Sequence, residues 1–241
     1  MRPNIYGPDL ALVHHLGFGS HAEACAPGIL ALLEPVRQRE GLVLELGCGS
    51  GALTRHLVGA GHRVVATDAS PAMAELTREH TPGVAEVRVL VVPGDPLPEA
   101  DAVVSVGHLL NYLPDEASID RALAAMAGAI RPRGVIAFDL CDLRFADARS
   151  GAPPYVRVED DWAIVTRYEV PAPARFVRHI TTFVRHEDGL WRRDDERHVN
   201  VVVDTSRVPA LLAGWGIAAR VTSSFGDERL PEGLVAVVGD R

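Results

Sequence analysis

Short apolar segments alternate with amphipathic segments through most of the chain. Compact apolar runs predict buried strands at 42–46, 63–67, 86–91, 101–106 and 134–139. Apolar residues at helical spacing predict helices between these strands, over about 51–60, 70–80 and 115–129. Parallel strands need helical crossovers, so this alternation predicts an α/β fold: a doubly wound, mostly parallel sheet covered by helices on both faces.

The segment before residue 41 is expected to be helical. A short helix is predicted over about 9–16, and a longer one over 21–39. Ser20 is a candidate N-cap for the longer helix, and Glu23, three residues on, would complete a capping box.

The pattern changes after residue 140. Residues 142–157 hold Pro, Gly and Arg and are expected to form a loop. Long, partly alternating segments follow at 162–170, 175–185 and 190–203, and the turn-forming residues 186–189 join the last two. These segments predict an antiparallel insertion after the fifth strand.

Residues 205–241 return to the α/β pattern. Thr205 or Ser206 is expected to cap a helix that ends near residue 213. Two further strands are predicted, at 219–223 and 234–238.

A glycine-rich turn follows the first predicted strand. Gly47, Gly49 and Gly51 separate that strand from a helical pattern, and this order is typical of a nucleotide-cofactor site. Glycines let a ligand approach the backbone, and the next helix directs free N–H groups at it. Glu45, just before the turn, favours a cationic or hydroxyl-rich ligand over a pyrophosphate. An ordinary loop stays open as an alternative, and so does a dinucleotide site, because Gly47, Gly49 and Ala52 also fit G-x-G-x-x-A.

The segment Glu45-Leu46-Gly47-Cys48-Gly49-Ser50-Gly51 resembles the E/D-x-G-x-G-x-G motif of class I S-adenosylmethionine-dependent methyltransferases. In that family the glycine loop wraps the methionine part of the cofactor. The resemblance implies S-adenosyl-L-methionine as cofactor and a seven-stranded, Rossmann-like sheet that ends in a close pair of strands. A nicotinamide-dependent dehydrogenase usually needs a catalytic domain after about residue 140, and the segment 142–204 is short for one.

Composition narrows the classes of partner. The chain has 241 residues, 47% of them hydrophobic, which suits one domain with an elaboration. A net charge of -8 disfavours nucleic-acid binding. Three widely spaced cysteines form neither a disulfide framework nor a zinc motif and indicate a reducing cytoplasm. No membrane span or signal peptide is expected, because no apolar run is long enough.

Asp68 is the leading candidate for the cofactor's ribose. It ends the second predicted strand, and acids at that position of a doubly wound sheet accept hydrogen bonds from ribose hydroxyls. A plain turn residue is the alternative. The resemblance also places Asp95 at the adenine amino group and Met73, of a family S-x-x-M motif, near the adenine. The full set of cofactor-binding residues that the resemblance implies is Glu45, Gly47, Cys48, Gly49, Gly51, Asp68, Ala69, Met73, Asp95, Ser105 and Val106.

The fourth predicted strand ends in Ser105-Val106-Gly107-His108. This stretch resembles the S-[IV]-G-H segment of bacterial amino-sugar N,N-dimethyltransferases, in which the histidine lies beside the acceptor amine. His108 is therefore a candidate general base, since an imidazole can take a proton near neutral pH. Orienting the acceptor and a structural role are the alternatives.

Further candidate site residues lie outside these motifs. Tyr6 resembles the N-terminal tyrosine that the amino-sugar enzymes fold over the cofactor and is, with His108, a candidate catalytic residue. Asn111, Tyr112 and Arg178 are candidate substrate residues. His14, His15 and His21 would belong to the lid, as packing residues or a proton relay. No metal site is indicated.

The resulting division has three parts: an N-terminal helical lid at 1–40, a cofactor-binding domain at 41–141 and 205–241, and the insertion at 142–204. The insertion is expected over the acceptor site, with a homodimer surface as its alternative role. The predicted activity is methyl transfer to a nitrogen of a small metabolite, as in bacterial natural-product biosynthesis. Methylation of an oxygen is the first alternative. A nicotinamide-dependent oxidoreductase and a non-catalytic ligand-binding module are the competitors from other classes.

Overall fold

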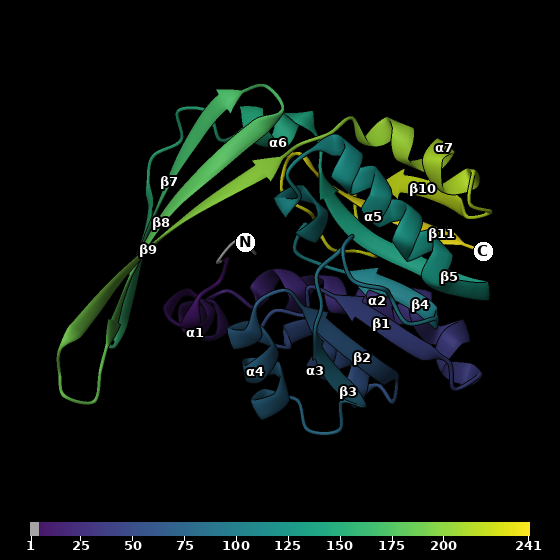
Figure 1. Ribbon diagram of the computed structural model, residues 1–241, viewed down its shortest axis with the longest axis horizontal. Coiled ribbons are helices and arrows are strands. Elements are labelled where there is room, and N and C mark those ends of the chain that lie inside the picture. The colour runs from purple at the N-terminus through teal and green to yellow at the C-terminus, as the bar shows by residue number, and fades with distance from the viewer. Residues whose placement is uncertain (1–4) are drawn as a thin grey trace.

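The computed structural model describes residues 5–241 and is built on a seven-stranded sheet (Figure 1). The strand order is β10-β11-β5-β4-β1-β2-β3, and only β11 runs antiparallel to its neighbours. The strands are β1 Leu42–Leu46, β2 Arg63–Asp68, β3 Glu86–Val89, β4 Ala100–Ser105, β5 Ile130–Cys141, β10 Ala218–Thr222 and β11 Leu234–Asp240. The predicted fold is confirmed.

Helices cover both faces of this sheet. The helices of the described chain are α1 Pro8–Gly17, α2 Ser20–Gln38, α3 Ala52–Gly59, α4 Pro71–His80, α5 Glu116–Ala129, α6 Leu143–Asp147 and α7 Val208–Ala213, with 3-10 turns η1 Leu109–Tyr112 and η2 Thr205–Arg207. Neighbouring residues of β1 point to opposite faces: Val43 packs with residues of α2 and α3, whereas Leu44 packs with residues of α5 and α7. Burial on both faces explains the nearly continuous apolar strands.

The insertion is a separate antiparallel sheet of order β6-β7-β8-β9. Its strands are β6 Tyr155–Val158, β7 Trp162–Ala172, β8 Arg175–Arg185 and β9 Trp191–Val201. The prediction of a loop over 142–157 is wrong, because this stretch contains α6 and β6. The side chain of Asp142 caps α6 by accepting from Arg144 N, and β6 forms by pairing with the edge of β7. Because the strand depends on this pairing, the sequence of β6 by itself gives little indication that a strand forms.

Two predicted helix caps are also wrong. Ser20 is the first residue of α2, Gly19 is its N-cap, and no side-chain cap bond forms there. The cap near residue 205 is Asp204, whose carboxylate accepts from Ser206 N. In contrast, Ser70 caps α4 as a serine before Pro71 should, by accepting from Met73 N.

The two N-terminal helices belong to different packing units. Leu10 and Val13 of α1 pack against Trp162, Ile180 and Val184 of the inserted sheet. The buried residues of α2 instead join the core under the main sheet. Figure 1 shows α1 beside the inserted sheet and α2 along the main one. The segment 1–40 is thus not one packing unit, and the three-part division stays a prediction.

Within the described residues, no single helix is long and apolar enough to cross a membrane. Only α1 and α2 taken together meet that length and composition, and they are bent by 65° relative to each other.

Candidate functional site

A cavity of about 240 Å³ lies at the carboxyl ends of β1, β2 and β4, roofed by the N-terminal segment. In a doubly wound sheet this edge, where the strand order reverses, is the ligand site. Of the predicted site residues, the cavity brings together Tyr6, Gly47, Cys48, Gly49, Asp68, Ala69, Met73, Val106 and Tyr112. Its wall does not include Glu45, Gly51, Asp95, Ser105, His108, Asn111 or Arg178.

The glycine loop is shaped by left-handed backbone. Gly47, Gly49 and Gly51 have φ values of 68°, 57° and 85°, which favour glycine. A Cβ on Gly47 would lie 2.5 Å from Leu109 Cδ1, whereas one on Gly49 would meet no atom within 4 Å. Gly47 is therefore needed for packing, and Gly49 leaves open space at the cavity wall. Gly51 sits behind the wall as the N-cap of α3.

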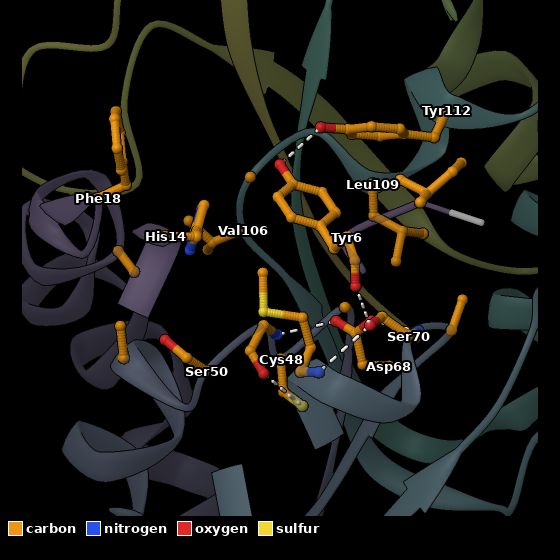
Figure 2. Close-up of a pocket in the computed structure, with 18 of the residues that line it drawn as sticks. Tyr6, His14, Phe18, Cys48, Ser50, Asp68, Ser70, Val106, Leu109 and Tyr112 are labelled. Atoms are coloured by element: carbon orange, nitrogen blue, oxygen red, sulfur yellow. Dashed lines mark hydrogen bonds between the residues drawn. The ribbon is translucent and has the colours of Figure 1, made fainter. Parts of the chain in front are cut away.

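Asp68 connects the glycine loop to the start of α4. Its Oδ2 accepts from Gly49 N at 2.9 Å, and its Oδ1 accepts from Ser70 N at 2.8 Å (Figure 2). Burial raises the pKa of this carboxyl above its usual range. Each carboxylate oxygen can accept a further bond, so the ribose role stays a prediction that this geometry accommodates.

Two other predicted acids lie away from the wall. Glu45 is buried in β1, where burial raises its pKa to about 8, and its Oε2 has no hydrogen-bond partner among the described residues. At neutral pH the side chain is therefore largely protonated, and it does not present a carboxylate to a ligand. Asp95 accepts from Val91 N at 2.8 Å, beside the wall residues Val91 and Val92.

His108, the candidate general base, does not line the cavity. Its ring stacks on Tyr112 at 5.6 Å and contacts the Phe145 ring at 5.7 Å. Burial, together with the charge of Arg178, lowers its pKa to about 3. An imidazole with that pKa is a poor proton acceptor at neutral pH, so the geometry favours a packing role over a general base.

Asn111 joins three elements and does not bind substrate in this arrangement. Its Nδ2 donates to Cys141 O at 3.2 Å and to Val201 O at 2.6 Å, and its Oδ1 accepts from Cys141 N at 2.9 Å. The side chain is fully buried. These bonds tie η1 to β5 and β9, which positions the neighbouring Tyr112.

Tyr6 and Tyr112 form the polar part of the roof. Their hydroxyls lie 2.9 Å apart, and Figure 2 shows them meeting at one end of the cavity. Arg178 of β8 donates to the Tyr112 hydroxyl from behind the wall. Ser70 Oγ donates to Tyr6 O at 2.6 Å, which joins the N-terminal segment to the loop after β2.

A histidine–carboxylate pair at the cavity was missed by the sequence interpretation. His21 lines the cavity, and its Nε2 lies 2.8 Å from Oδ2 of Asp139, a residue of β5. The Asp139 side chain is fully buried and also accepts from Gly107 N and His108 N. Burial alone would lower the pKa of His21, but the bonds to Asp139 and Cys25 raise it to about 10. His21 is thus a cation at neutral pH.

One signal for this pair was present in the sequence. Asp139 ends the predicted fifth strand, and ligands bind at the carboxyl ends of such strands. Other wall residues, Ile5, Phe18 and Leu109 among them, belong to no motif in the sequence.

The insertion supplies no residue to the cavity wall but anchors one that does. Glu196 of β9 accepts from Tyr6 N and Gly7 N, each at 2.8 Å, and from His198 at 2.7 Å. Tyr6 is held with φ of 57°, an uncommon value for a residue with a Cβ. The carboxylate of Glu196 therefore fixes the roof in place.

We expect Glu196→Ala to release the roof. Losing a charged acceptor from two N–H groups costs about 1.5–3 kcal/mol, so hydrogen exchange at the Tyr6 and Gly7 amides should accelerate roughly tenfold to hundredfold. Asp195→Ala, on the opposite face of the same strand, is the matched control. Equal exchange in parent and Glu196→Ala would contradict the anchoring role.

Known proteins with similar sequences include methyltransferases. A family model described as a methyltransferase domain matches residues 43–134. A Geobacillus sp. protein named as a methyltransferase is 22% identical over 202 residues, which span 80% of each chain.

Solved structures agree along nearly the whole length. An S-adenosylmethionine-dependent methyltransferase from Clostridium acetobutylicum has a TM-score of 0.77 at 15% identity, over 95% of this chain and 96% of its own. The sugar N-methyltransferase KedS8 from Streptoalloteichus sp. has a TM-score of 0.75 at 20% identity, over 98% and 96%. At these identities the likeness establishes the shared fold, insertion included.

Proposed function

We propose, from the premise that the chain is a class I S-adenosylmethionine-dependent methyltransferase, that it methylates a nitrogen of a small amine. The membership sets aside the nicotinamide-dependent and non-catalytic alternatives. The observation that carries the choice of nitrogen is the surroundings of the histidines near the cavity: His108 packs against Tyr112 and Phe145, and His21 is paired with Asp139. Neither His14, with its pKa lowered to about 4 by burial and Arg178, nor His108, at about 3, is a good base at neutral pH. His21 holds its proton to about pH 10.

An amine needs no enzymic base before attack. Its free-base form already carries a lone pair, whereas an alcohol must lose its proton to become a good nucleophile. Phenols and alcohols therefore suit this site less well. The cavity volume of about 240 Å³ supports a small acceptor, and KedS8 is named for methylation of a sugar nitrogen.

The cavity residues fit the cofactor. The open space over Gly49, the carboxylate of Asp68 and the buried side chain of Met73 would hold it at the glycine loop. When bound, S-adenosyl-L-methionine supplies a methyl group that its positive sulfur has already activated. With the cofactor bound, the acceptor nitrogen would take this methyl group while the S–C bonding pair stays with sulfur, and the ammonium product would release one proton to solvent.

The protein's own contribution is positioning. Tyr6, Leu109 and Tyr112 close the cavity around the acceptor, and Val106 and Gly107 form its floor at the end of β4. Holding reactants in line in a water-poor site accounts for a large part of such rate enhancements. The first experiment is a screen of amines, amino sugars, phenols and alcohols, with S-adenosylhomocysteine release as readout. Turnover confined to phenols or alcohols would contradict N-methylation and would show that the protein methylates an oxygen.

The pH dependence of kcat/KM should report the acceptor and not the enzyme's histidines. We expect log kcat/KM to rise with pH at unit slope and level off at the acceptor's own amine pKa, because only the free base reacts. Two amines whose pKa values differ by about two units should give profiles displaced by the same amount. An inflection near pH 6.5 that stays in place for both amines, at the ordinary pKa of histidine, would show that an enzymic base takes part.

A further inference from the structure

Arg178 is a half-buried cation that no described carboxylate neutralises. Its side chain donates to the Tyr112 hydroxyl, and its buried Nε has no hydrogen-bond partner within residues 5–241. Glu196, a carboxylate of the neighbouring strand β9, is already engaged by the Tyr6 and Gly7 amides and by His198. A guanidinium keeps its charge on burial, and a buried charge without a counter-ion is costly. The site is therefore suited to an anion that arrives with a ligand.

The hydroxyls of Tyr112 and Tyr6 connect Arg178 to the cavity through hydrogen bonds. Arginine can only donate, so the Tyr112 oxygen is an acceptor in its contact with Arg178. Tyr6 and Tyr112 share one hydrogen across their 2.9 Å contact. Whichever hydroxyl donates it, the other hydroxyl keeps a hydrogen of its own. Both tyrosines line the cavity, so the network presents to it an O–H donor polarised by a positive charge.

We propose that Arg178, acting through Tyr112 and Tyr6, selects an acceptor that carries an oxyanion, a carboxylate or a phosphate, in addition to the nitrogen that is methylated. The inference rests on the proposed function and names the substrate class of the same site. Neighbouring groups agree with it: the positive charge of Arg178 contributes to the lowered pKa of His14, His108 and His198. An ammonium would be repelled here, whereas an oxyanion meets a donor and an unpaired cation.

Anion binding tests the network without turnover. Acetate and inorganic phosphate are titrated by calorimetry into the S-adenosylhomocysteine complex of the parent, Arg178→Met, Tyr112→Phe and Tyr6→Phe. Tyr112→Phe and Tyr6→Phe remove single oxygen atoms, so they remain informative if Arg178→Met fails to fold. The parent should bind one of the two anions, which identifies the oxyanion, and each variant should bind it about tenfold or more weakly. Equal affinity in parent and variants overturns the proposal, as does binding of neither anion.

Selectivity between matched acceptors is the second test. The kcat/KM of an amino acid is compared with that of its carboxamide, and that of a phosphorylated amino sugar with that of the free sugar. The parent should favour the anionic member of one pair at least tenfold, and Arg178→Met should bring that ratio close to one. Arg167→Met, on the exposed face of the same sheet, removes an equal charge and should keep the ratio. A parent without preference, or an Arg178→Met variant that keeps it, contradicts the inference. If no amine is methylated but anion binding still depends on Arg178, the proposed N-methylation fails, and of this inference only the oxyanion site stands.

Discussion

Gly49→Ala is expected to weaken S-adenosylmethionine binding by about 1–3 kcal/mol, roughly 5-fold to 150-fold in Kd. A Cβ at this position has no heavy atom within 4 Å, and Gly49 lines the cavity. The added methyl group would therefore occupy space that the cofactor needs and would meet little protein. Isothermal titration with S-adenosylhomocysteine measures the effect directly.

Gly61→Ala is the matched control for backbone strain. Gly61 also has a left-handed backbone, with φ of 87°, and open space around its Cβ position, but it lies outside the cavity wall. Both variants should lose about 1–2 kcal/mol of stability from the strained conformation. Only Gly49→Ala should lose cofactor affinity. Equal affinity in the two variants would show that the cofactor does not lie against this part of the loop.

Asp139→Asn should destabilise the protein by about 3–5 kcal/mol, the usual cost of breaking a buried ion pair. The Asp139 carboxylate accepts from His21 at 2.8 Å, from Gly107 N at 2.9 Å and from His108 N at 2.6 Å. An amide in its place directs N–H groups at one or more of these donors. Urea unfolding at neutral pH measures the loss, and Asp195→Asn on the exposed insertion should leave stability unchanged within about 0.5 kcal/mol.

The pH dependence identifies His21 as the charged partner. Its pKa in the folded protein, raised to about 10, lies above the value near 6.5 of an unfolded chain. The pair's contribution is therefore complete below about pH 6.5 and is lost as pH rises through about 10. The stability difference between parent and Asp139→Asn should shrink across that window. A difference that stays constant from pH 6 to pH 10 would mean that His21 is neutral in the folded protein.

Local sequence was sufficient to predict most of the helices and strands. Strand and helix periods, the glycine turn and the Ser70-Pro71 cap are determined by residues close together in the chain, so they could be predicted. The placement of Asp68 at the cavity followed from one general rule, that parallel strands bring their carboxyl ends to the same edge. The strand β6 could not be predicted in this way, because it forms by pairing with β7 and its own hydrophobic pattern is weak.

The environment of each site side chain was decided only by the tertiary structure. His21 and Asp139 are 118 residues apart, and Arg178 lies 66 residues from Tyr112, yet each pair is in contact. The motif around His108 indicated a candidate base, with orienting and structural roles as alternatives, but packing against Tyr112 and Phe145, together with the charge of Arg178, lowers the pKa of the ring. Sequence by itself predicted where a cofactor would bind, because backbone turns and strand ends carry that information. Which side chains are charged and face the acceptor depends on burial and on partners distant in the chain, which no local pattern encodes.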